Sequence, residues 1–160
     1  MAEFDLRERL VTLLEGHGAH ISFGEAIDGF PSELIDRRVE SLAHTMWQLV
    51  YHLRITQWDI LDFIENPDHR SPSYPSGLWP DQDGPQKPAD WDETIAAFGQ
   101  DLERMKELVL NPDNDLFQAF PHGSGHNLFH EAITLGDHNS YHIGQVVDLR
   151  MLLGVPVKDW

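Results

Sequence analysis

Four segments of this chain repeat apolar residues three, four or seven positions apart, which is the spacing that gives an α-helix one apolar face. The segments are 4–29, 39–65, 90–109 and 128–153. Each of them runs into a glycine or a proline, residues that end helices. No segment of comparable length alternates apolar and polar residues as a half-buried strand does, and there is no internal repeat. The sequence therefore predicts an all-α fold of four helices.

The connection between the second and third predicted helices, residues 66–90, is long and contains six of the ten prolines. A helix of about 26 residues is roughly 39 Å long, and an extended segment of about 24 residues spans roughly twice that distance. We therefore predict a four-helix bundle with a long crossover loop between helices 2 and 3. Tyr74 and Trp79 are expected to anchor this loop on the bundle, where it borders a ligand pocket. The whole chain, 1–160, forms a single domain.

The charge and the lack of cysteine exclude several classes of protein. The chain has 27 acidic and 11 basic side chains, and its net charge of −16 at pH 7 repels nucleic acids and anionic lipid surfaces. No apolar run approaches the roughly 20 residues of a membrane span. Without cysteine there is no disulfide, no cysteine zinc finger and no cysteine nucleophile. We expect a cytoplasmic protein that acts on a small molecule and binds neither nucleic acid nor membrane.

Two of the ten histidines lie one helical turn apart within the apolar face of the fourth predicted helix. His138 and His142 share that face with Leu135 and Leu149, so both rings are expected to point into the bundle. His52 in the second predicted helix is the candidate third ligand, because its ring can point into the same bundle interior. Three neutral imidazoles with an open fourth position suit zinc or nickel, and we predict a divalent metal site formed by these three histidines.

Other assignments of the histidines stay open. His138 and His142 could instead form hydrogen bonds to buried carboxylates or backbone groups across the bundle. His44 is the competing third ligand, although it lies at the start of its helix and about 80° away from the chosen position. His122 and His126 are also four residues apart but lie among proline and glycine, where no continuous helix is expected, and we interpret them as loop residues.

Several sequence stretches match a known family. They are MWQLVYHL at 46–53, WDI at 58–60, YPSGLWP at 74–80 and DHNSYHIGQ at 137–145. In these stretches the chain resembles the DinB-like superfamily, and the resemblance covers nearly its whole length. It implies a four-helix bundle with a three-histidine metal site at one end, and the matching residues here are His52, His138 and His142.

The resemblance also implies a range of activities. Some members look like metal-dependent transferases that use low-molecular-weight thiols such as bacillithiol or mycothiol, some are related isomerases, and many have no assigned activity. We expect a metal-dependent thiol S-transferase, in which the ion lowers the pKa of the cofactor thiol, or a hydrolase, in which it activates water. A non-enzymatic metal- or small-ligand-binding bundle involved in stress response is the alternative.

Three residues outside the metal set bear on the choice between these activities. Thiol cofactors of this kind carry carboxylates, and the basic residues nearest the predicted ligands in sequence are Arg54 and Arg150. Glu131 lies seven residues before His138 on the same helical face and is the candidate base of a hydrolase. Its role as a surface or capping carboxylate is an equal possibility.

A strip of small residues on the fourth predicted helix suggests a close helix contact. Gly136, Ser140 and Gly144 are four residues apart, and Gly136 lies about 160° around the helix from His138. Glycine inside a helix costs roughly 1 kcal/mol relative to alanine, which close approach of another backbone can offset. The approaching backbone is either a neighbouring helix of the same bundle or a second subunit. We expect a homodimer, because dimers with twofold symmetry are the commonest oligomers of soluble proteins.

Overall fold

Every regular element in the computed structural model, which describes residues 2–158, is helical. The α-helices are α1 (Ala2–Glu15), α2 (Phe23–Ile27), α3 (Met46–Glu65), α4 (Pro88–Leu110) and α5 (Leu128–Leu152), with short 3₁₀ helices at Ser32–Leu34 and Ser76–Leu78. Within the described range no strand forms, and one isolated bridge pairs Ala119 with Asn127. The all-α prediction is therefore confirmed, with five α-helices in that range where four were expected.

The predicted helix 4–29 is wrong, because two helices occupy this segment. α1 ends just before Gly16, whose φ of +80° is a left-handed conformation that glycine adopts readily and that terminates the helix. A new helix starts after Ser22, whose hydroxyl accepts a hydrogen bond from the Glu25 amide while the Glu25 carboxylate accepts one from the Ser22 amide. Both α1 and α2 pack on α5, so apolar spacing continues across the break and hides it in the sequence.

The helix predicted at 39–65 begins later, at Met46. Thr45 caps it, because its hydroxyl accepts a hydrogen bond from the Gln48 amide and the Gln48 side chain accepts one from the Thr45 amide. The C-terminal end follows the prediction, since α3 stops at Glu65 before the Asn-Pro pair. The later start still leaves His52, the ligand predicted in this segment, inside the helix.

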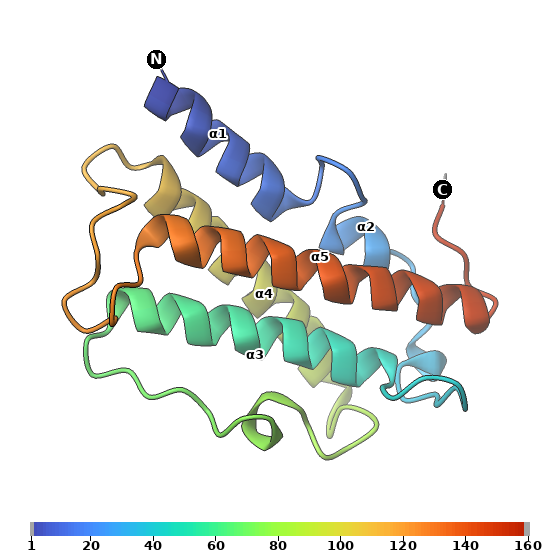
Figure 1. Cartoon of the computed structure of the whole chain (residues 1–160). Coiled ribbons are helices and arrows are strands. Elements are labelled where there is room, and N and C mark those ends of the chain that lie inside the picture. The colour runs from blue at the N-terminus through green and yellow to red at the C-terminus, as the bar shows by residue number, and fades with distance from the viewer. Residues whose placement is uncertain (1, 159–160) are drawn as a thin grey trace.

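The long helices pack around a common core (Figure 1). α3 contacts α4 and α5, and α1 contacts the same two helices from the other side. In Figure 1, α3 and α4 run in one direction while α1 and α5 run in the other. The core has two clusters of buried side chains, one around Val50, Phe98 and Val146 and the other around Met105 and Leu135. α3 and α5 therefore lie side by side, which brings their inward faces together.

The segment between α3 and α4 returns along the outside of α3 (Figure 1). The Arg38 guanidinium donates to the Asp83 carboxylate, and the Thr45 hydroxyl donates to the Asp83 carbonyl at 2.6 Å. Trp79 packs against the core, whereas Tyr74 is 88% exposed and does not serve as the anchor that the sequence suggested. An aromatic residue in a proline-rich loop can be either packed on the core or exposed, so composition alone could not show that Trp79 is packed and Tyr74 exposed.

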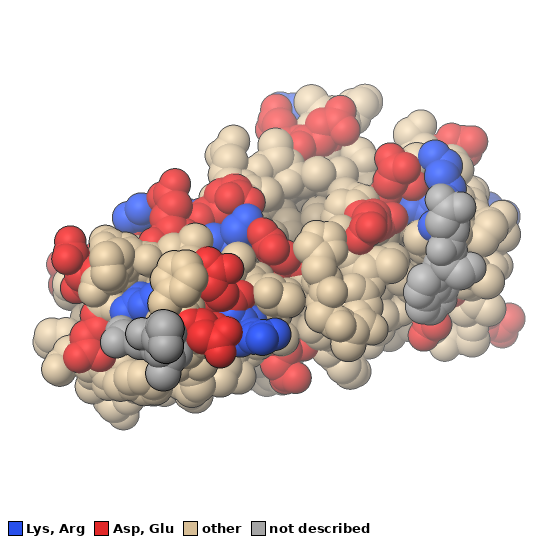
Figure 2. All heavy atoms as spheres, turned by 90° about the horizontal axis from the view of Figure 1, so that it is seen from above, with Lys and Arg blue, Asp and Glu red and all other residues tan. Residues whose placement is uncertain are grey.

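Acidic side chains are spread widely over the surface. Figure 2 shows patches of Asp and Glu scattered across the face drawn, with fewer Lys and Arg among them. Among the described residues, no helix combines the length and apolar character needed to cross a bilayer.

Candidate metal centre

The packing of α3 against α5 brings the three predicted ligands together. His52 is on the second turn of α3, and His138 and His142 are on adjacent turns of α5. The Nε2 atoms of His52 and His138 are 3.1 Å apart, and the His142 ring centroid is 4.6 Å from each of the other two ring centroids. One nitrogen from each ring can be chosen so that all three lie within 4.8 Å of one another, as ligands of a single ion must.

Hydrogen bonds at the Nδ1 atoms fix the ring orientation of two of these histidines. His52 Nδ1 donates to the Leu78 carbonyl at 2.9 Å, and His142 Nδ1 donates to Gln145 Oε1 at 2.7 Å. Both acceptors require a proton on Nδ1, so each Nε2 presents a lone pair to the interior. Oxygen acceptors behind a histidine are the usual support of a metal ligand.

His138 completes the convergent set, because its Nε2 faces the Nε2 of His52 at 3.1 Å. Its Nδ1 is buried without a hydrogen-bond partner among the described residues, and an ion bound at Nε2 would leave it so. Three convergent imidazoles at this position are the ligand set of an open metal site, so the residues present fit a divalent ion.

Burial keeps the three rings neutral. It lowers the pKa of His52 and of His138 from 6.5 to about 4, and it also lowers the pKa of His142. Because imidazole binds metal only in its neutral form, the rings are ready to act as ligands at neutral pH.

Trp79 separates the cluster from the competing candidate His44. The indole lies between two imidazoles, 3.7 Å from the His52 ring and 3.8 Å from the His44 ring between centroids, and is nearly parallel to both. His44 is therefore on the far face of the indole and outside the group of convergent rings. The structure thus brings His52, and not His44, together with His138 and His142.

A cavity of about 430 Å³ opens onto the histidine cluster. Its wall includes Asp59, which the sequence analysis did not select as a functional residue. Asp59 lies seven residues after His52, hence on the same face of α3, and this spacing was the available signal. His69 holds the carboxylate in place, since its Nε2 is 2.8 Å from Asp59 Oδ1 and its Nδ1 bonds Asp62.

The other acidic candidate, Glu131, does not line this cavity. Its buried carboxylate instead accepts a hydrogen bond from His126 Nδ1 at 2.7 Å. Glu131 is in the first turn of α5, about two turns before the histidine cluster, so sharing a helical face did not place it at the same depth.

The two arginines nearest the ligands in sequence have different positions. Arg150 is buried near the C-terminal end of α5 and donates to the Ala26, Asp28 and Val155 carbonyls, which is a structural role. Arg54 instead lines a larger cavity of about 690 Å³ between α3, α4 and the connecting segment.

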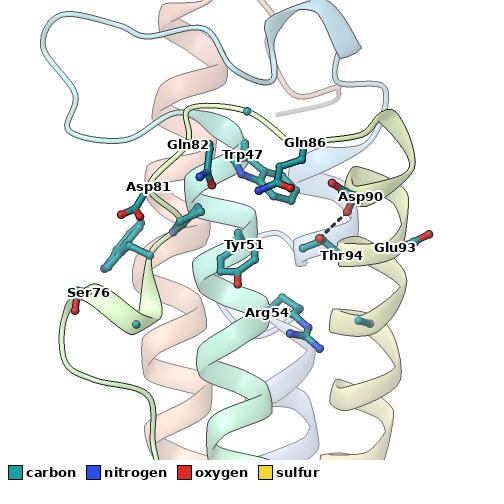
Figure 3. A pocket seen from close by; sticks show the side chains of 15 residues that line it. Trp47, Tyr51, Arg54, Ser76, Asp81, Gln82, Gln86, Asp90, Glu93 and Thr94 are labelled. Atoms are coloured by element: carbon teal, nitrogen blue, oxygen red, sulfur yellow. Dashed lines mark hydrogen bonds between the residues drawn. The ribbon is translucent and has the colours of Figure 1, made fainter.

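Figure 3 shows this larger cavity, with Arg54 reaching from α3 toward α4 below Tyr51. Trp47 also lines it, and its indole Nε1 is buried without a hydrogen-bond partner among the described residues. Trp79 borders both cavities, and the His44 and His52 rings stack on its indole.

Comparison of the chain with protein-family models, with curated proteins and with solved structures found no match. The geometry of the described residues therefore carries the functional argument.

Proposed function

We propose that this protein is a metal-dependent enzyme that binds zinc or nickel through His52, His138 and His142 and acts on a small molecule. The observation that carries the proposal is the convergence of three neutral imidazoles, two buried and that of His138 half-buried, at the wall of a cavity. A bound divalent ion would supply Lewis-acid chemistry there, lowering the pKa of a thiol or of water. The open side toward the cavity gives a substrate group access to the cluster.

We further propose a DinB-like four-helix bundle with one crossover. The mutual packing of α1, α3, α4 and α5 supports this assignment, as does the common direction of α3 and α4 in Figure 1, which requires the connecting segment to return along the bundle. The metal site proposed here uses α3 and α5 of that bundle.

Transfer of a low-molecular-weight thiol is the first candidate reaction. Arg54 in the larger cavity can pair with a carboxylate of the thiol cofactor, and the Trp47 indole lines the same cavity about two helical turns away (Figure 3). The aromatic side chains of Tyr51 and Trp79 offer apolar walls for the rest of the molecule. A chain without cysteine has no thiol of its own to compete, and a reducing cytoplasm would keep the cofactor thiol free.

Hydrolysis is the second candidate, and Asp59 favours it. The Asp59 carboxylate faces the same cavity as the histidine cluster and can accept a proton from a nucleophile bound there. His69, paired with Asp59 and Asp62, fixes the position of this base. A protein that binds metal or a small ligand without turnover remains the alternative to both reactions.

A homodimer through the outer face of α5 completes the proposal. Gly144 is exposed and has open space around it, and the exposed Tyr141, Met151 and Leu152 lie on the same side of the helix. Gly136, by contrast, is in contact with Leu13 of α1, so that part of the small-residue strip serves packing within the protomer.

The test begins with zinc binding by metal-free protein prepared without a histidine tag. His52→Ala should lose one equivalent relative to the wild type, whereas His44→Ala, on the far face of Trp79, should lose none. Equal zinc binding by the wild type and His52→Ala would contradict the site.

Turnover then separates the candidate reactions. The metal-loaded protein is assayed with bacillithiol, mycothiol or glutathione plus chlorodinitrobenzene, and separately with nitrophenyl esters. Thiol transfer should depend on Arg54, and ester hydrolysis should depend on Asp59; His142→Ala should abolish either one. Metal binding without activity in either panel supports the non-enzymatic alternative.

A further inference from the structure

We propose a second divalent metal site at the N-terminal end of α5, formed by His126, His130 and Glu131. Ligand atoms of these three residues lie within 4.8 Å of one another. The His126 and His130 ring centroids are 4.7 Å apart, and His126 Nδ1 is 2.7 Å from Glu131 Oε1. This site is independent of the function proposed above, because it shares no residue with the histidine cluster.

A turn, rather than a continuous helix, brings the two histidines together. The Phe120 amide donates to the His126 carbonyl at 2.8 Å, and the His126 amide donates to the Gly123 carbonyl at 2.8 Å. Asn127 then caps α5 by accepting a hydrogen bond from the His130 amide at 2.9 Å. Proline and glycine do interrupt the helix here, as the sequence indicated, but the cap at Asn127 still leaves both rings next to the first turn of α5.

Glu131 distinguishes this group from an ordinary surface pair of histidines. Its side chain is only 6% exposed, whereas the His126 side chain is 49% exposed. A carboxylate buried beside an imidazole is stabilised by a cation held between the two groups. The carboxylate also offsets the positive end of the helix dipole, which would otherwise disfavour a cation at this position.

The donor set indicates which ions the site takes. Two imidazoles and one carboxylate bind zinc, iron(II) or manganese(II), and the exposed side of both rings leaves room for water ligands. On binding, the ion takes the place of the proton between His126 and Glu131. Their 2.7 Å separation then widens to roughly 3.3–3.6 Å, which follows from ligand distances of about 2.0–2.2 Å around a tetrahedral ion.

The position of the site indicates a role in fixing the connection between α4 and α5. His122 Nε2 already bonds the Phe63 carbonyl at 2.7 Å, which attaches this segment to the end of α3. An ion on His126, His130 and Glu131 would attach the same segment to the start of α5. Eight residues separate His130 from His138, or about 12 Å along the helix, so the two metal sites are distinct.

The experiment is an isothermal titration calorimetry measurement, in which zinc chloride is added to metal-free, tag-free, full-length protein. We expect two zinc equivalents for the wild type. His130→Ala should lose one of them, with that equivalent weakened by more than about tenfold, the lower end of the loss caused by removing even an outer support of a ligand. His17→Ala, an exposed histidine outside both groups, should retain two.

Two further variants keep the result unambiguous. His52→Ala should lose the other equivalent, and the double variant His52→Ala/His130→Ala should lose both. Because His130 is exposed, its replacement is not expected to unfold the chain, and circular dichroism checks this.

Amide hydrogen exchange supplies a second measurement. Zinc should slow exchange across 119–127 in the wild type and in His52→Ala but leave it unchanged in His130→Ala. Two equivalents in His130→Ala, or a single equivalent in the wild type that His52→Ala removes, would overturn the proposal while leaving the histidine cluster of α3 and α5 intact.

Discussion

Gly136 is the place where a single methyl group most directly tests the packing of α1 on α5. A Cβ atom at this position would lie 2.6 Å from Leu13 Cγ, 2.9 Å from Leu13 Cδ2 and 3.3 Å from Leu13 Cδ1. The closest atom is the branch point of the side chain, so a change of rotamer at the tip cannot relieve the overlap. α1 must move away from α5, or the leucine must leave its packed position.

The size of the effect follows from two opposing terms. Overpacking of this kind costs about 1–3 kcal/mol. Replacing a glycine inside a helix by alanine gains up to about 1 kcal/mol. Gly136→Ala is therefore expected to range from neutral to about 3 kcal/mol destabilising. Gly99, which is inside α4 with open space around it, is the matched control, and Gly99→Ala should stabilise by up to about 1 kcal/mol.

Urea unfolding of metal-free protein, followed by circular dichroism, measures both variants. The two should differ by about 1–3 kcal/mol in the free energy of unfolding. Leu13→Ala in the Gly136→Ala background should restore part of the loss, and the double-mutant cycle should give a favourable coupling between the two changes. If Gly136→Ala is as stabilising as Gly99→Ala, the close contact of Leu13 with α5 is not a constraint and the reasoning fails.

Three other predictions follow from the structure. Metal-free protein should lose stability as the pH falls from about 6.5 to about 4, because burial lowers the pKa of His52 and of His138 to about 4 and the unfolded chain therefore takes up protons that the folded chain does not. These two groups cause no further loss below about pH 4, and the loss is at most about 3 kcal/mol per ring. Urea unfolding at several pH values should show a smaller dependence of stability on pH in His138→Leu. Gly144→Leu should convert a dimeric wild type to a monomer in light scattering, and a monomeric wild type would refute the dimer. Limited proteolysis should cut slowly within 71–83, and Asp83→Ala, which removes the partner of Arg38, should accelerate cleavage there.

The sequence predicted the helices best where their ends carry strong local signals. Asn66 and Asn111, each followed by proline, set the C-terminal ends of α3 and α4 correctly. Segment 4–29 failed because the left-handed Gly16 interrupts a run whose apolar spacing continues beyond it. Apolar spacing reports which face is buried, and it does not report whether the backbone between two buried positions is continuous.

The candidate site was likewise predictable only in part. His52, His138 and His142 could be selected from the sequence because periodicity gives the direction of a side chain around its helix. Depth along the bundle depends on how two helices are aligned, and periodicity does not contain that information. Glu131 lies on the predicted face of α5 but too near the start of that helix to reach the cavity beside the histidine cluster. Asp59, on α3, lines that cavity and was not predicted.

Trp79 makes a paramagnetic ion in the histidine cluster detectable by fluorescence. Its indole stacks face to face on a proposed metal ligand, His52, with 3.7 Å between ring centroids. Ions with unpaired electrons quench an excited indole at contact distance, whereas zinc does not. The chain has five tryptophans, so nickel entering the cluster should quench the Trp79 part of the emission while zinc does not, and the difference should shrink in Trp79→Phe. Trp79 thus distinguishes a paramagnetic ion from zinc in the cluster, without dye or label.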